Sequence, residues 1–225
     1  GAFCSSAARN LLRYGPSRVH FAMVVQTGPV VEAPLAYANH PPLVAWLVAA
    51  IFAALGEGEV QARVVPWSLS LLAAGGMFAL LRRAGATGLL SAAGALLAVG
   101  TPMWARYATM VDPQGSGPLA AMVLLAWVAT GPARWFRSIG LLAVAVPGLL
   151  YDWPVTGAAL LVSGWLLTRA EDRRDGLLLL LTTGLVLAGL ATWTASLDGV
   201  VTLLASPLET AQNRAALGAV LAHDD

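Results

Sequence analysis

Long uncharged runs alternate with short charged turns along most of the chain. Four runs have 18 to 22 residues, enough for a helix to cross the roughly 30 Å hydrocarbon core of a bilayer. They cover residues 64–81, 84–105, 113–133 and 176–197. Two shorter runs, 138–151 and 153–168, lie between the third and the fourth. This pattern predicts an all-α polytopic membrane protein with about six transmembrane helices.

The composition supports this prediction. The 225 residues are 58% hydrophobic and 11% charged, whereas a soluble domain carries about 25% charged residues. The formal net charge of +1 gives no reason to expect a nucleic-acid partner. The single cysteine, Cys4, excludes an internal disulfide framework and is interpreted as a passive residue. The expected environment is therefore a lipid bilayer, with the chain crossing a cell membrane several times.

Arginine-rich turns predict the orientation, because short cytoplasmic loops collect basic residues. These turns contain Arg82 and Arg83, Arg134 and Arg137, and Arg169, Arg173 and Arg174. With all three turns on the cytoplasmic face, the two short runs must form a hairpin whose tip, residues 151–154, points outward. Its arms of 14 and 16 residues reach only about 21 to 24 Å. The tip is therefore expected in a recessed, protein-lined cavity.

The region before the first long run is then external. Residues 3–18 have an amphipathic pattern that ends at Gly15-Pro16, which predicts a short helix on the membrane surface. Residues 43–56 are too few to span and predict an interfacial or re-entrant helix, and the polar residues 57–63 are expected in the headgroup region.

Three regions follow from this reading. They are an external loop with interfacial helices (1–63), a transmembrane helix bundle (64–197) and an external juxtamembrane segment (198–225). An external amino-terminal region needs a preceding membrane anchor. We therefore expect one transmembrane helix upstream of Gly1, and further helices after residue 225.

A polar and aromatic turn, residues 37–42, precedes the predicted interfacial helix. Because proline suits the first turn of a helix, Asn39 or His40 is expected to cap a helix that Pro41-Pro42 begins. The turn could serve only as this cap. Alternatively, it could present Tyr37, Asn39 and His40 as binding groups at the mouth of the helix.

The predicted topology brings His40, Arg106, Asp112 and Asp152 to the external side. An ionisable residue at membrane depth is by default a functional-site hypothesis, and Asp152 at the hairpin tip is the best case; its alternative is a turn cap. Asp112, which precedes Pro113, is either a helix cap or a carboxylate that acts as a general base or binds a divalent ion. Arg106 could pair with Asp112, bind a phosphate or snorkel.

Five stretches together resemble the membrane glycosyltransferases that take a sugar from a polyprenyl-phosphate donor. This group contains the dolichyl-phosphate-mannose protein mannosyltransferases and the aminoarabinose transferase of lipid A. The stretches are Ala8 to Gly15, Tyr37 to Leu43, Gly56 to Arg63, Arg82-Arg83, and Met110 to Pro113. The resemblance covers roughly residues 7–170 and rests on the order and spacing of these stretches.

The resemblance implies transfer of the sugar to a lipid, glycan or protein acceptor on the external face, without nucleic acid. Asp112 matches an Asp of the second external loop that belongs to an acidic pair associated with catalysis and metal binding, which implies Mg²⁺ or Mn²⁺. The other acidic motif of the family normally follows the first transmembrane helix. Its expected place is immediately before Gly1.

One departure concerns the donor phosphate. Many relatives carry Lys-Gly-Pro at a hairpin where this chain has Asp152-Trp153-Pro154. A carboxylate cannot bind a phosphate directly. Phosphate binding is therefore expected at Arg63 or Arg106, or through a metal held by Asp112 or Asp152.

A membrane transporter or a non-catalytic membrane scaffold is the alternative function. Transporters commonly contain repeated halves with helices broken at corresponding positions, and the sequence shows no second copy of the short hairpin at 138–168. The long external region before the first run also favours an enzyme. We therefore predict a glycosyltransferase with Asp112 as its catalytic or metal-binding residue.

Overall fold

The computed structural model describes residues 2–24, 36–37, 40–101, 108–131 and 134–197. Within these ranges the chain forms eight helices: α1 (Ala2–Tyr14), α2 (Leu43–Leu55), α3 (Glu59–Arg83), α4 (Gly88–Val99), α6 (Ser116–Ala129), α7 (Arg134–Tyr151), α8 (Pro154–Leu167) and α9 (Arg173–Ala195). Two short strands, β1 (Met23–Val24) and β2 (Ala36–Tyr37), pair antiparallel. The mostly helical fold confirms the all-α part of the prediction.

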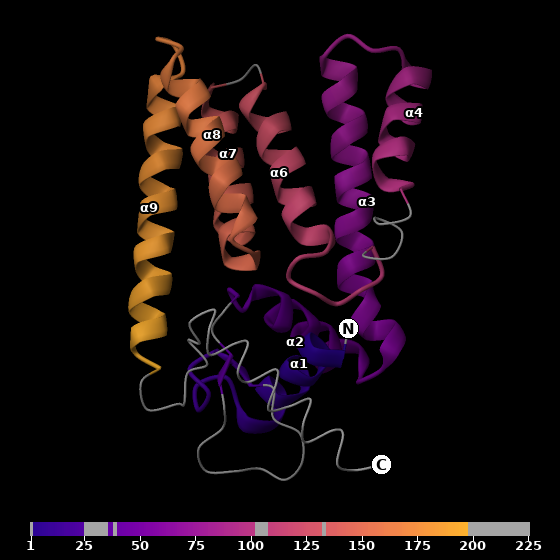
Figure 1. The fold of residues 1–225 in the computed structure, drawn as a ribbon, viewed down its shortest axis with the longest axis vertical. Helices are drawn as coiled ribbons and strands as arrows, with labels where there is room; N and C mark the ends of the chain where they lie inside the picture. The colour runs from indigo at the N-terminus through magenta and orange to yellow at the C-terminus, as the bar shows by residue number, and fades with distance from the viewer. Residues whose placement is uncertain (1, 25–35, 38–39, 102–107, 132–133, 198–225) are drawn as a thin grey trace, which may run out of the picture.

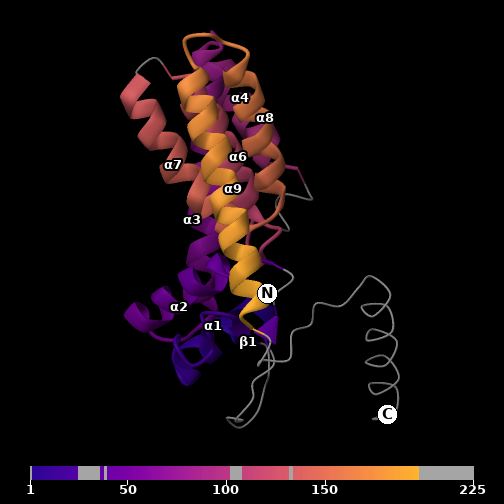
Figure 2. The ribbon, with the colours of Figure 1, turned by 90° about the vertical axis from the view of Figure 1, so that its left-hand side faces the viewer.

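The helices form an upright bundle with a smaller module across one end. Helices α3, α4 and α6 to α9 run along the long axis, whereas α1 and α2 lie at the lower end (Figure 1). The view turned by 90° shows the same arrangement (Figure 2). The α7–α8 turn faces the module, and α7 contacts α2. The hairpin predicted at 138–168 is thus confirmed, with its tip at the junction of module and bundle.

Two helices in the described ranges, α3 and α9, are long and apolar enough to cross a membrane. The predicted spans 84–105 and 113–133 are wrong in length, because α4 has 12 residues and α6 has 14. The Thr87 side chain caps the start of α4, which ends at Val99. Before α6, the chain forms a turn in which the Gly115 N–H donates to the Asp112 carbonyl (3.2 Å), so this helix begins only at Ser116. About six transmembrane helices are therefore not confirmed.

The polar residues 57–63 run directly into the first long helix. Helix α3 begins at Glu59 and continues through Pro66, so the predicted boundary between residues 63 and 64 falls inside a helix. An ion pair between Arg63 and Glu59, one turn apart, supports this first turn. The Ser116 hydroxyl donates to the Pro66 carbonyl (3.0 Å) and joins the start of α6 to α3.

The predicted amphipathic helix near the amino terminus is confirmed as α1. Its buried apolar face consists of Cys4, Ala7, Ala8 and Leu11, whose successive separations of three, one and three residues are typical of one face of a helix. This face shares a core with buried residues of α2, among them Val44, Val48 and Phe52. The small alanines leave room for close helix packing, so α1 and α2 form one module.

A strained turn ties this module to the bundle. His20 and Phe21 have φ angles of 51° and 58°, a left-handed conformation that non-glycine residues rarely adopt. The indole N–H of Trp46 in α2 donates to the Phe21 carbonyl (2.8 Å), and that of Trp193 in α9 donates to the His20 carbonyl (2.7 Å). Two indoles from different parts of the fold therefore hold this turn in place.

Cys4 gives a direct test of the module's packing. Its side chain is 1% exposed, and burial, aided by the nearby Asp112 carboxylate, raises the pKa of the Cys4 thiol to about 12. The thiolate is the reactive form. We therefore expect no reaction with a maleimide at pH 8 in the folded protein and full reaction after denaturation, as measured by intact-mass spectrometry. Rapid labelling of the native protein would show that α1 does not pack as described.

Candidate functional site

A cavity of about 730 Å³ lies where the turn before α2, the start of α6 and the α7–α8 tip meet. Its lining is contributed by stretches far apart in the sequence: His40, Thr101, Gln114, Gly115, Pro118, Leu119, Met122, Asp152, Trp153 and Pro154. Most of this lining is apolar, with a few polar groups among it. Such a mixture is typical of small-molecule sites, which measure about 300–1,000 Å³.

The central polar contact of the cavity joins His40 to Asp152. His40 Nδ1 lies 2.8 Å from Asp152 Oδ1, although the two residues are 112 positions apart. Asp152 is 1% exposed and His40 is 17% exposed at the side chain. The predicted convergence of these two residues is therefore a direct contact, and its external position stays a prediction.

Asp152 is not a cap of helix α8. The Val155 and Thr156 N–H groups bond to backbone carbonyls, at 3.3 and 2.9 Å, rather than to this carboxylate. Asp152 Oδ1 instead accepts the Trp153 N–H (2.9 Å) in addition to His40. The second oxygen, Oδ2, is buried and has no hydrogen-bond partner among the described residues. A buried carboxylate that is half unsatisfied is costly, which favours a functional interpretation over a turn cap.

The predicted capping role of His40 is wrong. Pro42 is the N-cap residue of α2, and the His40 ring is turned toward Asp152 instead. Tyr37 stacks on His40 with a centroid distance of 6.0 Å, and Phe3 packs edge-on against Tyr37 at 4.7 Å. The structure thus brings Tyr37 and His40 together, whereas Asn39 lies outside the described residues.

Asp112 lies near this cavity but not in its lining. Its Oδ1 accepts the Gln114 N–H (2.8 Å), which fixes the turn before α6, and Gln114 itself lines the cavity. Within the described ranges, no group of three or more His, Cys, Asp or Glu side chains could hold a metal. Mg²⁺ or Mn²⁺ would therefore need ligands beyond Asp112, such as donor phosphate oxygens and water.

Arg63 lines a second cavity of about 590 Å³, between α1, the start of α3 and residues 109–111. Arg9 of α1 lines the same cavity and was missed by the sequence reasoning, because it occupies the polar face of an amphipathic helix. Each arginine is paired with a glutamate: Arg9 with Glu57 at 2.6 Å, and Arg63 with Glu59. Such exposed pairs are weak, so an anionic ligand could compete for either arginine. Arg106 lies outside the described residues.

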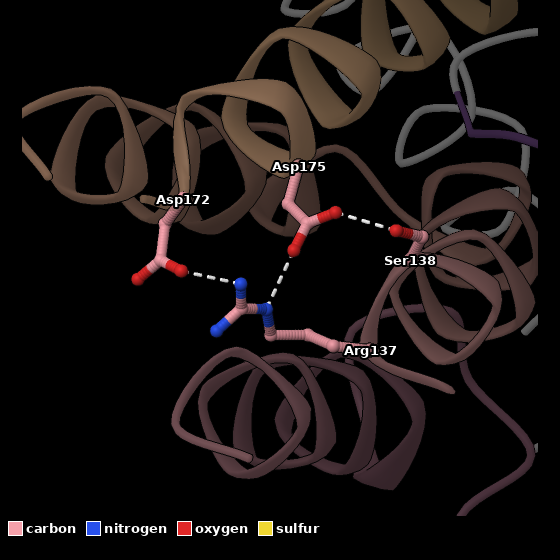
Figure 3. Close-up of polar contacts among 4 residues, drawn as sticks. All are labelled: Arg137, Ser138, Asp172 and Asp175. Atoms are coloured by element: carbon pink, nitrogen blue, oxygen red, sulfur yellow. Dashed lines mark hydrogen bonds and ion pairs between the residues drawn. The ribbon is translucent and has the colours of Figure 1, made fainter. Parts of the chain in front are cut away.

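A second buried polar cluster joins the start of α7 to the start of α9 (Figure 3). Arg137 Nε donates to Asp175 Oδ2 (2.6 Å), and its terminal guanidinium nitrogen Nη2 pairs with Asp172. The Ser138 hydroxyl donates to Asp175 Oδ1. All three charged side chains are nearly buried. The sequence reasoning missed this cluster, because it used Arg137 only as an orientation signal.

Comparison with known proteins adds no evidence on function. No family model, no curated protein and no solved structure matches the chain. The resemblance to lipid-phosphate glycosyltransferases stays a prediction. The function is therefore argued from the cavity and its residues.

Proposed function

We propose that the chain belongs to an integral-membrane glycosyltransferase that transfers a sugar from a polyprenyl-phosphate donor to an acceptor hydroxyl on the external face of a cell membrane. The observation that carries the proposal is the buried His40–Asp152 pair in a mainly apolar cavity beside long apolar helices. A lipid-linked substrate needs such a combination of polar centre and apolar surroundings. The arginine-rich turns at the other end support an external position for this cavity.

The cavity also offers groups for a sugar. Gln114 has an exposed amide that can bond to hydroxyl groups, and Trp153, which is 41% exposed, offers an apolar aromatic face. In the transfer, the acceptor hydroxyl attacks the sugar carbon and the lipid phosphate leaves. Because this leaving group is already anionic, stabilisation of its charge matters more than a general acid. Arg9 and Arg63, which line the second cavity, are the candidates for that role.

The test is sugar transfer by the full-length protein in membranes, with a panel of radiolabelled polyprenyl-phosphate sugars and with nucleotide sugars as comparison. We expect transfer from a lipid donor. Asp112→Asn keeps an oxygen that can accept the Gln114 N–H and removes only the charge. If the carboxylate acts in the reaction, transfer should fall by about 100-fold or more at unchanged expression.

The matched control is Glu171→Gln, which removes an exposed acid from the α8–α9 turn and should leave transfer unchanged. No transfer from any lipid donor would overturn the proposed function. Unchanged transfer by the Asp112→Asn variant would leave Asp112 as a turn residue without a part in the mechanism.

A further inference from the structure

The pair formed by His40 and Asp152 has the arrangement of a proton acceptor and its positioning residue. We infer that His40 Nε2 takes the proton of the acceptor hydroxyl and that Asp152 orients the His40 ring; this inference rests on the proposed transfer reaction. It gives His40 a chemical role where the sequence predicted only a capping or binding role.

The geometry leaves the correct nitrogen available. His40 Nδ1 is directed at Asp152 Oδ1, 2.8 Å away. When the carboxylate is charged, Nδ1 must carry the hydrogen, and the lone pair then lies on Nε2. His40 lines the cavity, and the described residues provide no hydrogen-bond partner for Nε2. The stacked Tyr37 ring further limits how the imidazole can turn.

Asp152 is placed to stabilise positive charge that appears on the His40 ring during the reaction. The carboxylate is buried, and its Oδ2 has no partner among the residues that the structure describes. A neutral imidazole compensates this charge only through one hydrogen bond. Once His40 gains a proton, the same contact becomes a charge-assisted pair, so the fixed carboxylate stabilises charge that appears during the reaction.

The step balances without another reactant. As the acceptor oxygen bonds to the anomeric carbon of the sugar, its proton passes to His40 Nε2. The bond between that carbon and the phosphate oxygen breaks, and the electron pair leaves on the lipid phosphate. The imidazolium then returns its proton to the departing phosphate, which has gained a negative charge, or to water.

Three substitutions in the full-length protein test the inference, with the lipid donor that supports transfer. His40→Asn keeps an amide N–H that can donate to Asp152 but cannot accept the proton, so kcat should fall about 100-fold or more. His40→Ala should show the same loss, and added imidazole should restore part of its rate. Asp152→Asn should lower kcat with little change in KM, because Asp152 acts on the reaction through the His40 ring and not by contact with the substrate.

His20→Asn is the matched control, since His20 is exposed and asparagine tolerates its left-handed backbone. This variant should keep the wild-type rate with or without imidazole. A wild-type rate in the His40→Asn variant would overturn the inference and leave the transfer function intact. If His40→Ala lost its rate and imidazole did not restore it, the His40–Asp152 pair would be a structural contact, and the inference would also be overturned. No transfer by the wild type would overturn the proposed function and the inference together.

Discussion

Arg137→Met is expected to lower the free energy of unfolding by about 3–5 kcal/mol, because it leaves two buried carboxylates without a cation. The Arg137 side chain is 7% exposed, and Asp172 and Asp175 are 6% and 5% exposed. Methionine keeps much of the volume, so little of the loss arises from a cavity. The substitution should weaken the packing of α7 against α9, because this cluster joins the two helices (Figure 3).

Unfolding by denaturant in detergent micelles measures this loss. Arg82→Met is the matched control, because Arg82 is exposed and should contribute about 0.5 kcal/mol or less. The triple variant with Asp172→Asn and Asp175→Asn should recover most of the loss, since it removes the uncompensated charges. A triple variant no more stable than Arg137→Met would show that the hydrogen bonds, rather than the charges, carry the stability.

The sequence predicted those parts of the fold that depend on periodicity and on the placement of arginine. The spacing of Cys4, Ala7, Ala8 and Leu11 defines one face of α1, and the basic flanks of residues 138–168 require a hairpin. Helix ends were predicted less well. The uncharged run 84–105 contains Gly85, Thr87 and Gly100, so hydropathy does not show that α4 begins after Thr87 and ends at Val99. The left-handed φ of Gly85 (91°) and the Thr87 cap mark the start of this helix.

The candidate site was predicted in part. The topology placed His40 and Asp152 on one side, but their contact depends on how the α1–α2 module packs over the hairpin tip, which local patterns do not encode. The prolines after His40 suggested a capping role, whereas a buried carboxylate is a stronger partner for the ring. Likewise, the sequence placed residues 57–63 before the helix, whereas residues 59–63 form its first turn. This position puts Arg63 in a separate cavity.

Gly117→Ala is expected to destabilise the protein by about 1–3 kcal/mol and to disturb the site. A Cβ at Gly117 would lie 2.1 Å from Cε1, 2.3 Å from Cζ and 2.5 Å from Cδ1 of Tyr151. The Tyr151 ring is 4% exposed and belongs to the core of the α1–α2 module, so it cannot turn away into solvent. Either α6 or the hairpin tip must move, and Asp152 follows Tyr151 directly.

Unfolding midpoints and transfer rates, measured on the same preparations, test this prediction. Gly157→Ala in α8 is the matched control, because its Cβ would meet no atom within 4 Å; as a plain helix substitution it should stabilise by about 0.5–1 kcal/mol. Combining Gly117→Ala with Tyr151→Leu should cost less than the sum of the two single variants, since a smaller side chain relieves the contact. If the Gly117→Ala and Gly157→Ala variants were equally stable, the close approach of α6 to Tyr151 would not hold the hairpin tip in place.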